Sequence, residues 1–229
     1  LSARGTMHCP RNLVYMNKIV TSEEAHDVID IDAPVSENIR RVAAAKGKKP
    51  AEITVVVLDR PRHEKLMQDI RKAGARVKLI SDGDVSAAIE AALPDTDVDM
   101  LMGIGGTPEG VLSAAAIRCI GGCIQCKGWP RDEKEKQEAI NKGEDLKKVY
   151  CTEDLISSDD VFFAATGVSS GNLLKGVRYF AGGATTQSIA MRGRSGTLRW
   201  VDARHNFSKL EKLDMTSFVK NRKWYQSQS

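Results

Sequence analysis

Short apolar segments alternate with helix-like segments through the first half of the chain. The apolar segment Ile53–Leu58 is continuous and β-branched, which is typical of a strand covered on both faces. Helical composition follows it and stops at Gly74, and an earlier helix, capped by Ser36, ends at Gly47. Such an alternation with short connections predicts an α/β fold, in which a mainly parallel sheet with right-handed crossovers carries helices on its faces. The predicted strands of this half are residues 13–20, 53–58, 75–80 and 98–102, and the third helix is 85–93.

The second half of the chain adds further strands and a hairpin. Segments 185–192 and 196–204 alternate in polarity around a Gly-containing turn, which predicts an antiparallel β-hairpin. We therefore expect one α/β portion over residues 1–210 and a polar, basic tail over residues 211–229. The other predicted elements are strands at 122–129 and 161–167, a charged helix within 131–144 and a short capped turn at Thr152.

The glycine-rich stretch Gly103–Gly110 is predicted to form the turn from a strand into a helix. Thr107 is a suitable N-cap, Pro108 suits the first helical position, and Glu109 falls in the first turn. Free amides at a helix start favour an anion, and a first-turn carboxylate can hold a metal ion beside it. The alternative is a glycine-rich turn without a ligand. The stretch is not a P-loop, because no Gly-Lys-Ser/Thr follows, and Pro108 occupies the third glycine position of a dinucleotide fingerprint.

Charged residues follow three consecutive predicted strands. Arg60 and Arg62 come after the second strand, Asp82 and Asp84 after the third, and Glu109 after the fourth. Each group alone is compatible with a solvated charge pair or an ordinary turn. Because the carboxyl ends of parallel strands meet at one crevice, the three together favour a site. Arginines there would clamp a phosphate, the aspartates would accept hydrogen bonds from sugar hydroxyls, and Glu109 would hold a metal.

Composition excludes several classes of partner. The 229 residues are 41% hydrophobic and 28% charged, with a net charge of +4 whose basic residues are spread along the chain. We therefore expect no nucleic-acid partner, whereas a polyanionic small substrate is compatible. No apolar run reaches membrane-spanning length and no signal peptide is visible, so we expect no membrane partner and a cytoplasmic location.

The five cysteines, an odd number, predict reduced thiols. The spacing of Cys119, Cys123 and Cys126 superficially matches an iron–sulfur motif. Positions 123 and 126 of a strand face opposite sides, however, so buried structural thiols are the expected reading.

Five motifs occur in one order along the chain: Tyr15-Met, Arg60-Pro-Arg-His63, Asp82-Gly-Asp-Val85, Gly103–Gly110 and Ala165-Thr-Gly167. Their order and spacing resemble the class II fructose-1,6-bisphosphatases of the GlpX type, and the chain is similar to an actinobacterial member from near its first residue to about residue 205. The resemblance implies a layered α/β fold of the lithium-sensitive phosphatase type. It also implies an enzyme of gluconeogenesis that forms homo-oligomers. Such enzymes convert fructose 1,6-bisphosphate to fructose 6-phosphate with Mg2+ or Mn2+, and some also accept sedoheptulose 1,7-bisphosphate.

The resemblance also assigns roles to individual residues. Glu109 matches the last metal ligand of the family pattern. The arginines would grip the phosphate that stays on the product, and Gly106 would allow close approach of the substrate to the backbone. The residues that match substrate-contacting positions are Tyr15, Arg60, Arg62, Asp82, Asp84 and Gly106.

The chain departs from the family pattern in one large respect. The Gly-Glu-Gly-Glu and Asp-Pro-Ile-Glu-Gly-Thr-like segments that carry the family's remaining metal ligands and its catalytic threonine do not occur in this sequence. The chain therefore resembles the C-terminal two thirds of such an enzyme, with catalytic residues expected in a missing N-terminal part and no activity expected of the fragment alone. The alternatives are a non-catalytic sugar-phosphate-binding module, if the gene begins at Leu1, and a nucleotide-binding α/β enzyme.

Overall fold

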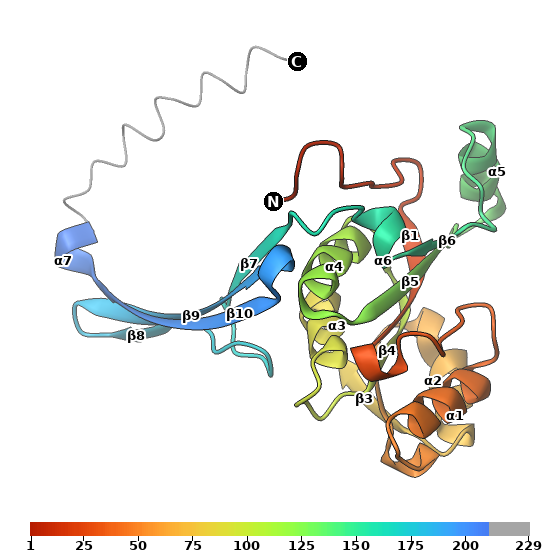
Figure 1. Ribbon diagram of the computed structural model, residues 1–229, viewed down its shortest axis with the longest axis horizontal. Coiled ribbons are helices and arrows are strands. Elements are labelled where there is room, and N and C mark those ends of the chain that lie inside the picture. The colour runs from red at the N-terminus through yellow and green to blue at the C-terminus, as the bar shows by residue number, and fades with distance from the viewer. Residues whose placement is uncertain (211–229) are drawn as a thin grey trace. The chain divides into compact units, whose positions relative to one another are not determined.

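The computed structural model describes residues 1–210, and the predicted tail over 211–229 lies outside the described residues (Figure 1). The strands are β1 (Tyr15–Thr21), β2 (Thr54–Leu58), β3 (Arg76–Ile80), β4 (Met100–Gly106), β5 (Cys123–Gly128), β6 (Val149–Cys151), β7 (Phe162–Thr166), β8 (Arg178–Phe180), β9 (Gly183–Arg192) and β10 (Thr197–Asn206). The α-helices are α1 (Val35–Ala45), α2 (Glu64–Lys72), α3 (Asp84–Ala92), α4 (Thr107–Ile120), α5 (Glu133–Asn141), α6 (Thr152–Leu155) and α7 (Phe207–Leu210). Short 3-10 helices are η1 (Glu23–Ala25), η2 (Pro50–Glu52), η3 (Pro61–His63) and η4 (Gly193–Ser195).

Six strands form the central sheet in the order β3-β2-β4-β1-β5-β6. Strand β2 pairs in parallel with β3 and with β4. Strand β1 runs antiparallel to both β4 and β5, and β6 runs antiparallel to β5. Four strands, β2 to β5, therefore share one direction, as the strand–helix alternation predicts. The two reversed strands, β1 and β6, make the sheet mixed.

Strand β2, near the middle of this sheet, is apolar and buried at every position between its ends, so it is covered on both faces. Val55 and Val57 pack in a cluster with Ile39 of α1 and Ile70 of α2, whereas the side chain of the intervening Val56 is buried outside this cluster. Helices α3 and α4 pack against each other, and α4 buries small side chains that allow close packing. Burial of each large aliphatic side chain contributes about 1.5–3 kcal/mol.

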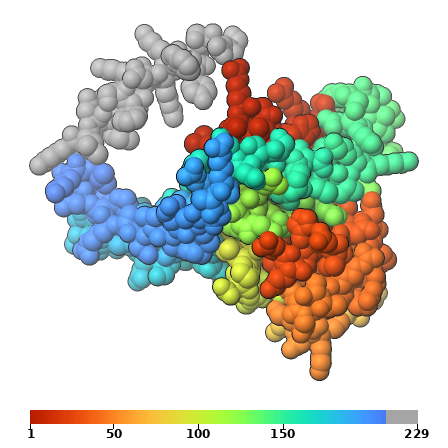
Figure 2. Space-filling model, viewed as in Figure 1, coloured from red at the N-terminus to blue at the C-terminus, as the bar shows by residue number. Residues whose placement is uncertain are grey.

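The first residues of the chain are held by the segment that follows β6. The amide of His8 donates to the carbonyl oxygen of Leu155, and Ser2 forms an isolated antiparallel bridge with Val161. Figure 2 shows these N-terminal residues lying against the segment around residue 155. The N-terminal segment is thus part of the packed structure.

The chain divides into two compact units. The larger comprises Leu1–Ala164 with Ala190–Arg199 and contains the central sheet. The described residues of the smaller are 165–189 and 200–210. A second sheet has the order β10-β9-β7 with β8 added to β9, so the predicted hairpin is confirmed.

Some boundaries and short elements differ from the sequence predictions. Helix α1 begins at Val35 with Pro34 at the N-cap, so Ser36 lies inside the first turn and is not the cap. The short strands β6 and β8 were not predicted, because three-residue segments carry too little periodicity to be recognised.

The structure confirms the prediction that the clustered cysteines are buried thiols. Cys119, Cys123 and Cys126 are all buried. Burial raises the pKa of Cys119 to about 11 and the pKa of Cys123 to about 12, so the thiols stay protonated. Within residues 1–210, no helix is long and apolar enough to cross a membrane.

Candidate functional site

The sequence-predicted site residues gather at one edge of the central sheet. Because β2, β3 and β4 are parallel, the segments that follow them leave the sheet at the same edge. Strand β1 runs the opposite way, so its first residue, Tyr15, lies opposite Gly106, the last residue of β4. The structure therefore brings the arginines, the aspartates, Tyr15, Gly106 and Glu109 to one edge.

The two arginines make different contacts. Arg60 donates from Nη2 to the Oδ1 of Asp82 at 3.0 Å and from Nη1 to the carbonyl of Asp59, which links the loops after β2 and β3. Arg62 donates to the carbonyl of Ile104 at 3.0 Å, and its guanidinium carbon lies 5.4 Å from the ring centroid of Tyr15. Both guanidiniums keep most of their five N–H donors for other partners.

The glycine-rich stretch is not the loop that the sequence suggests. Residues Gly103–Gly106 form the end of β4 and pair with β1. Helix α4 begins at Thr107 with Gly106 at the N-cap, so the prediction of Thr107 as the cap is wrong by one residue. The reason is that the amide of Thr107 donates to the carbonyl of Val14, which carries the β1 pairing directly into the helix. The buried hydroxyl of Thr107 has no partner among the described residues.

The glycines of this stretch make room for neighbouring side chains. A Cβ at Gly103, where φ is +138°, would lie 3.1 Å from the Nε2 of His63. At Gly105 it would overlap the carboxylate of Asp84, and at Gly106 that of Glu109. Consecutive strand residues direct Cβ to opposite faces, so Asp84 and Glu109 lie on opposite faces of the strand end.

A buried ion pair supports Asp84, and sequence reasoning missed it. The Nζ of Lys18, on β1, lies 2.7 Å from the Oδ2 of Asp84 at the start of α3. Lys18 is buried beside Gly105, where a Cβ would lie 2.8 Å from its Nζ, so the glycine leaves space for the lysine side chain. The pair fixes the position of the Asp84 carboxylate at the edge of the sheet. A lysine in an alternating strand gives no sign of this, because its partner is distant in sequence.

His63 is a second residue that sequence reasoning did not assign. Its Nδ1 donates to the carbonyl of Leu58 at 2.8 Å, and its Nε2 accepts from the amide of Ile104 at 2.8 Å. An acceptor at Nε2 requires the neutral ring. Burial, helped by the charges of Arg62 and Arg60, lowers the pKa of His63 against the opposing effect of the Leu58 carbonyl. The ring thus ties β2 to the glycine-rich end of β4.

The residues described do not by themselves fit a divalent metal ion. Glu109 is exposed, and residues 1–210 contain no group of three or more His, Cys, Asp or Glu side chains placed to share one ion. Mg2+ is bound octahedrally by oxygen ligands, and one carboxylate is a small part of such a set. No catalytic step follows from this donor set. What the edge offers chemically is an arrangement of guanidiniums, carboxylates and a close backbone, which suits a phosphorylated polyhydroxy compound.

Comparison with known proteins gives a consistent family match. The family model of the bacterial fructose-1,6-bisphosphatase, glpX-encoded, matches residues 1–205. The chain is 42% identical over 214 residues to the D-fructose 1,6-bisphosphatase class 2/sedoheptulose 1,7-bisphosphatase of Synechococcus sp. (strain JA-2-3B'a(2-13)), covering 88% of this chain and 61% of that protein. It is 42% identical over 215 residues to the protein of the same name from Trichodesmium erythraeum (strain IMS101), covering 88% and 62%. The chain thus spans about three fifths of the length of the curated relatives it matches.

Proposed function

Because the chain belongs to the glpX-encoded bacterial fructose-1,6-bisphosphatase family, we propose that it forms the substrate-binding part of a fructose-bisphosphatase. The whole enzyme hydrolyses the 1-phosphate of fructose 1,6-bisphosphate and releases fructose 6-phosphate for gluconeogenesis. The observation that supports this most directly is the gathering of two arginines and two aspartates at one edge of the sheet, beside a glycine strand end.

Each side chain of this edge has a role suited to a sugar phosphate. Arg60 and Arg62 hold the phosphate that remains on the product, because planar guanidiniums bind phosphate oxygens in pairs. Asp82 and Asp84 accept hydrogen bonds from sugar hydroxyls. Gly106 lets the substrate approach the main chain, and the ring of Tyr15 lines the phosphate end.

The family is metal-dependent, and we assign the ion as Mg2+ or Mn2+. Glu109 supplies one of its oxygen ligands, and the other ligands and the catalytic groups come from residues outside this sequence. The ion would supply the activation of water and the neutralisation of the leaving phosphate. We further propose a cytoplasmic homo-oligomer.

The test combines binding with turnover. The 229-residue chain is expected to bind fructose 6-phosphate in calorimetry but to release no phosphate from fructose 1,6-bisphosphate with Mn2+. A longer protein that contains this chain is expected to release phosphate, and Glu109→Gln in that protein should abolish turnover. Turnover near the wild-type rate in that variant would overturn the role of Glu109. Absence of sugar-phosphate binding would overturn the proposed function.

The same phosphate-release assay tests a second substrate. The relatives are named as bisphosphatases for both fructose 1,6-bisphosphate and sedoheptulose 1,7-bisphosphate. We propose that this site also accepts sedoheptulose 1,7-bisphosphate, because the arginines recognise a phosphate and not the chain length. Mutual competition between the two sugars in the longer protein is the expected result. Binding without turnover in that longer protein would favour the non-catalytic binding module instead.

A further inference from the structure

A second guanidinium lies on the ring of Tyr15. Strand β5 runs in the same direction as β4, so the chain leaves β5 at the edge that carries the candidate site. The amide of Trp129, just after β5, donates to the carbonyl of Tyr15, and the two rings meet edge-on at 6.4 Å. The guanidinium carbon of Arg131 lies 5.5 Å from the centroid of Tyr15, and that of Arg62 lies 5.4 Å from the same centroid.

Arg131 is held in this place by the start of α5. Its Nε and Nη2 each donate to the carboxylate of Glu135 at 3.1 Å, and its main-chain amide donates to the same carboxylate at 2.7 Å. The amide of Glu135 in turn donates to Asp132, the N-cap of α5. The hydrogen bonds from Arg131 lower the pKa of Glu135, which keeps its carboxylate ionised. These hydrogen bonds hold the guanidinium beside the ring of Tyr15.

This anchoring leaves most of the guanidinium available. Glu135 uses two of the five side-chain N–H donors, and the side chain of Arg131 is 57% exposed. Two cations on one aromatic ring repel each other, and the ring offsets only part of that repulsion. A doubly charged phosphate beside the ring offsets the rest and satisfies N–H groups of both arginines.

We infer that Arg131 is a further phosphate-binding residue of this site, acting with Arg62 on the phosphate that the product retains. The inference rests on the proposed function and adds to it a residue from a third segment of the chain. It follows that α5 contributes to substrate affinity although the helix is not part of the sheet, because Glu135 of α5 holds the Arg131 guanidinium.

The test measures binding of fructose 6-phosphate to the 229-residue chain by calorimetry. Arg131→Met is expected to raise the Kd roughly tenfold or more, as loss of charge-assisted hydrogen bonds requires. Arg131→Lys should restore part of the affinity because it keeps the charge. The matched control is Arg40→Met, since Arg40 forms a similar two-contact pair with Glu37 on α1, and its Kd should equal that of the wild type.

The ionisation of the bound phosphate distinguishes direct phosphate binding by Arg131 from an indirect role in which Arg131 only orients the ring of Tyr15. A neighbouring guanidinium favours the dianion, so the second pKa of bound fructose 6-phosphate, followed by phosphorus NMR, should rise in Arg131→Met. An unchanged phosphate pKa would overturn direct contact, and so would an unchanged Kd in a chain whose wild type binds. If the wild type binds no sugar phosphate, the proposed function itself fails, which is a distinct result.

Discussion

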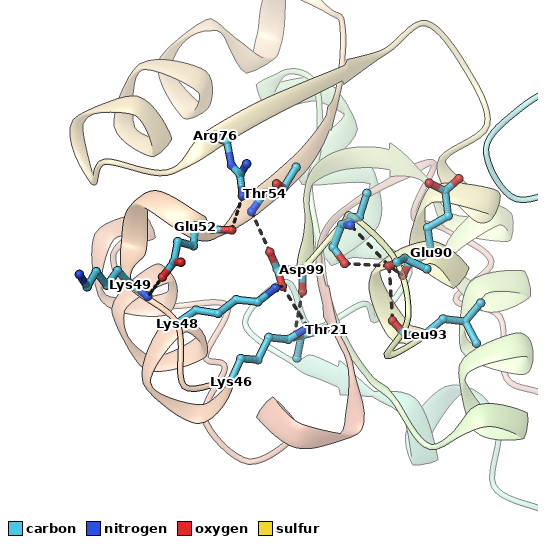
Figure 3. Close-up of polar contacts among 12 residues, drawn as sticks. Thr21, Lys46, Lys48, Lys49, Glu52, Thr54, Arg76, Glu90, Leu93 and Asp99 are labelled. Carbon is cyan, nitrogen blue, oxygen red and sulfur yellow. Dashed lines mark hydrogen bonds and ion pairs between the residues drawn. The ribbon is translucent and has the colours of Figure 1, made fainter.

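Replacing Asp99 by asparagine removes the centre of a buried ion-pair network at the other end of β4. Figure 3 shows Lys46 and Lys48 both pointing toward Asp99. The Oδ1 of Asp99 lies 2.6 Å from the Nζ of Lys48 and 3.3 Å from that of Lys46, and its Oδ2 accepts from the amide of Thr54 at 2.9 Å. The network joins the segment after α1 to the starts of β2 and β4.

The cost of this substitution follows from burial. The side chains of Asp99 and Lys46 are 3% and 6% exposed, so an asparagine leaves a buried ammonium without its counter-charge. Breaking a buried pair by removing one partner costs about 3–5 kcal/mol in the free energy of unfolding. Asp97→Asn is the matched control, because Asp97 pairs with Lys78 while 77% exposed, and such surface pairs contribute about 0–1 kcal/mol.

The pH dependence gives an independent check. Burial raises the pKa of Asp99, but the hydrogen bonds from Lys48 and Thr54 and the charges of Lys46 and Lys48 outweigh it and hold the pKa below its ordinary value. A depressed folded-state pKa contributes stability that is complete above the unfolded pKa of about 3.9 and is lost as the pH falls through the lower folded value. Urea unfolding at pH 7 should therefore separate wild type from Asp99→Asn by about 3 kcal/mol or more. The gap should narrow below pH 4.

The reasoning is refuted by a difference below about 1 kcal/mol at pH 7, the range of surface pairs. A difference as large for Asp97→Asn as for Asp99→Asn would refute it equally, since burial would then not be the cause. Lys46→Met should cost less than Asp99→Asn, because Asp99 retains Lys48 and the Thr54 amide.

Two further predictions concern the candidate site and its frame. Gly106→Ala should change the free energy of unfolding by less than about 1 kcal/mol, because its Cβ would overlap only the flexible carboxylate of Glu109, which it displaces. Gly193→Ala should lower the free energy of unfolding by more than about 2 kcal/mol, because its Cβ would overlap the main-chain oxygen of Asp159. Urea unfolding of both variants checks this order, and equal costs would contradict it. The pKa of His63 is lowered in the folded protein, so the unfolded chain takes up the proton first and the free energy of unfolding of the wild type falls below about pH 6.5. His63→Gln removes this proton uptake. The variant should therefore lose less stability than the wild type between pH 7 and 5. Identical pH slopes for the two proteins would show that His63 is not held neutral.

The sequence alone determined the order of the longer strands and helices along the chain and the sheet edge at which the candidate site lies. The continuous β-branched segment at β2 is typical of a strand that is buried on both faces, and the helical segments around it each have one apolar face to bury. These requirements favour helices packed on both faces of a sheet. Parallel pairing of β2, β3 and β4 then places Arg60, Asp82 and Gly106 together without any knowledge of side-chain contacts.

Only the tertiary structure decided what supports those residues. Lys18 is buried against Asp84, which lies 66 residues further along the chain, and His63 meets the amide of Ile104, 41 residues further along. The glycine-rich stretch suggested a turn, but residues Gly103–Gly106 continue the strand because they pair with β1. Glycine suits these positions because the ring of His63 and two carboxylates occupy the space that Cβ atoms would fill. Arg131 joins Tyr15 only because β1 runs antiparallel between β4 and β5. Local periodicity records which residues face a core, whereas partners so far apart in sequence are chosen by the pairing of strands.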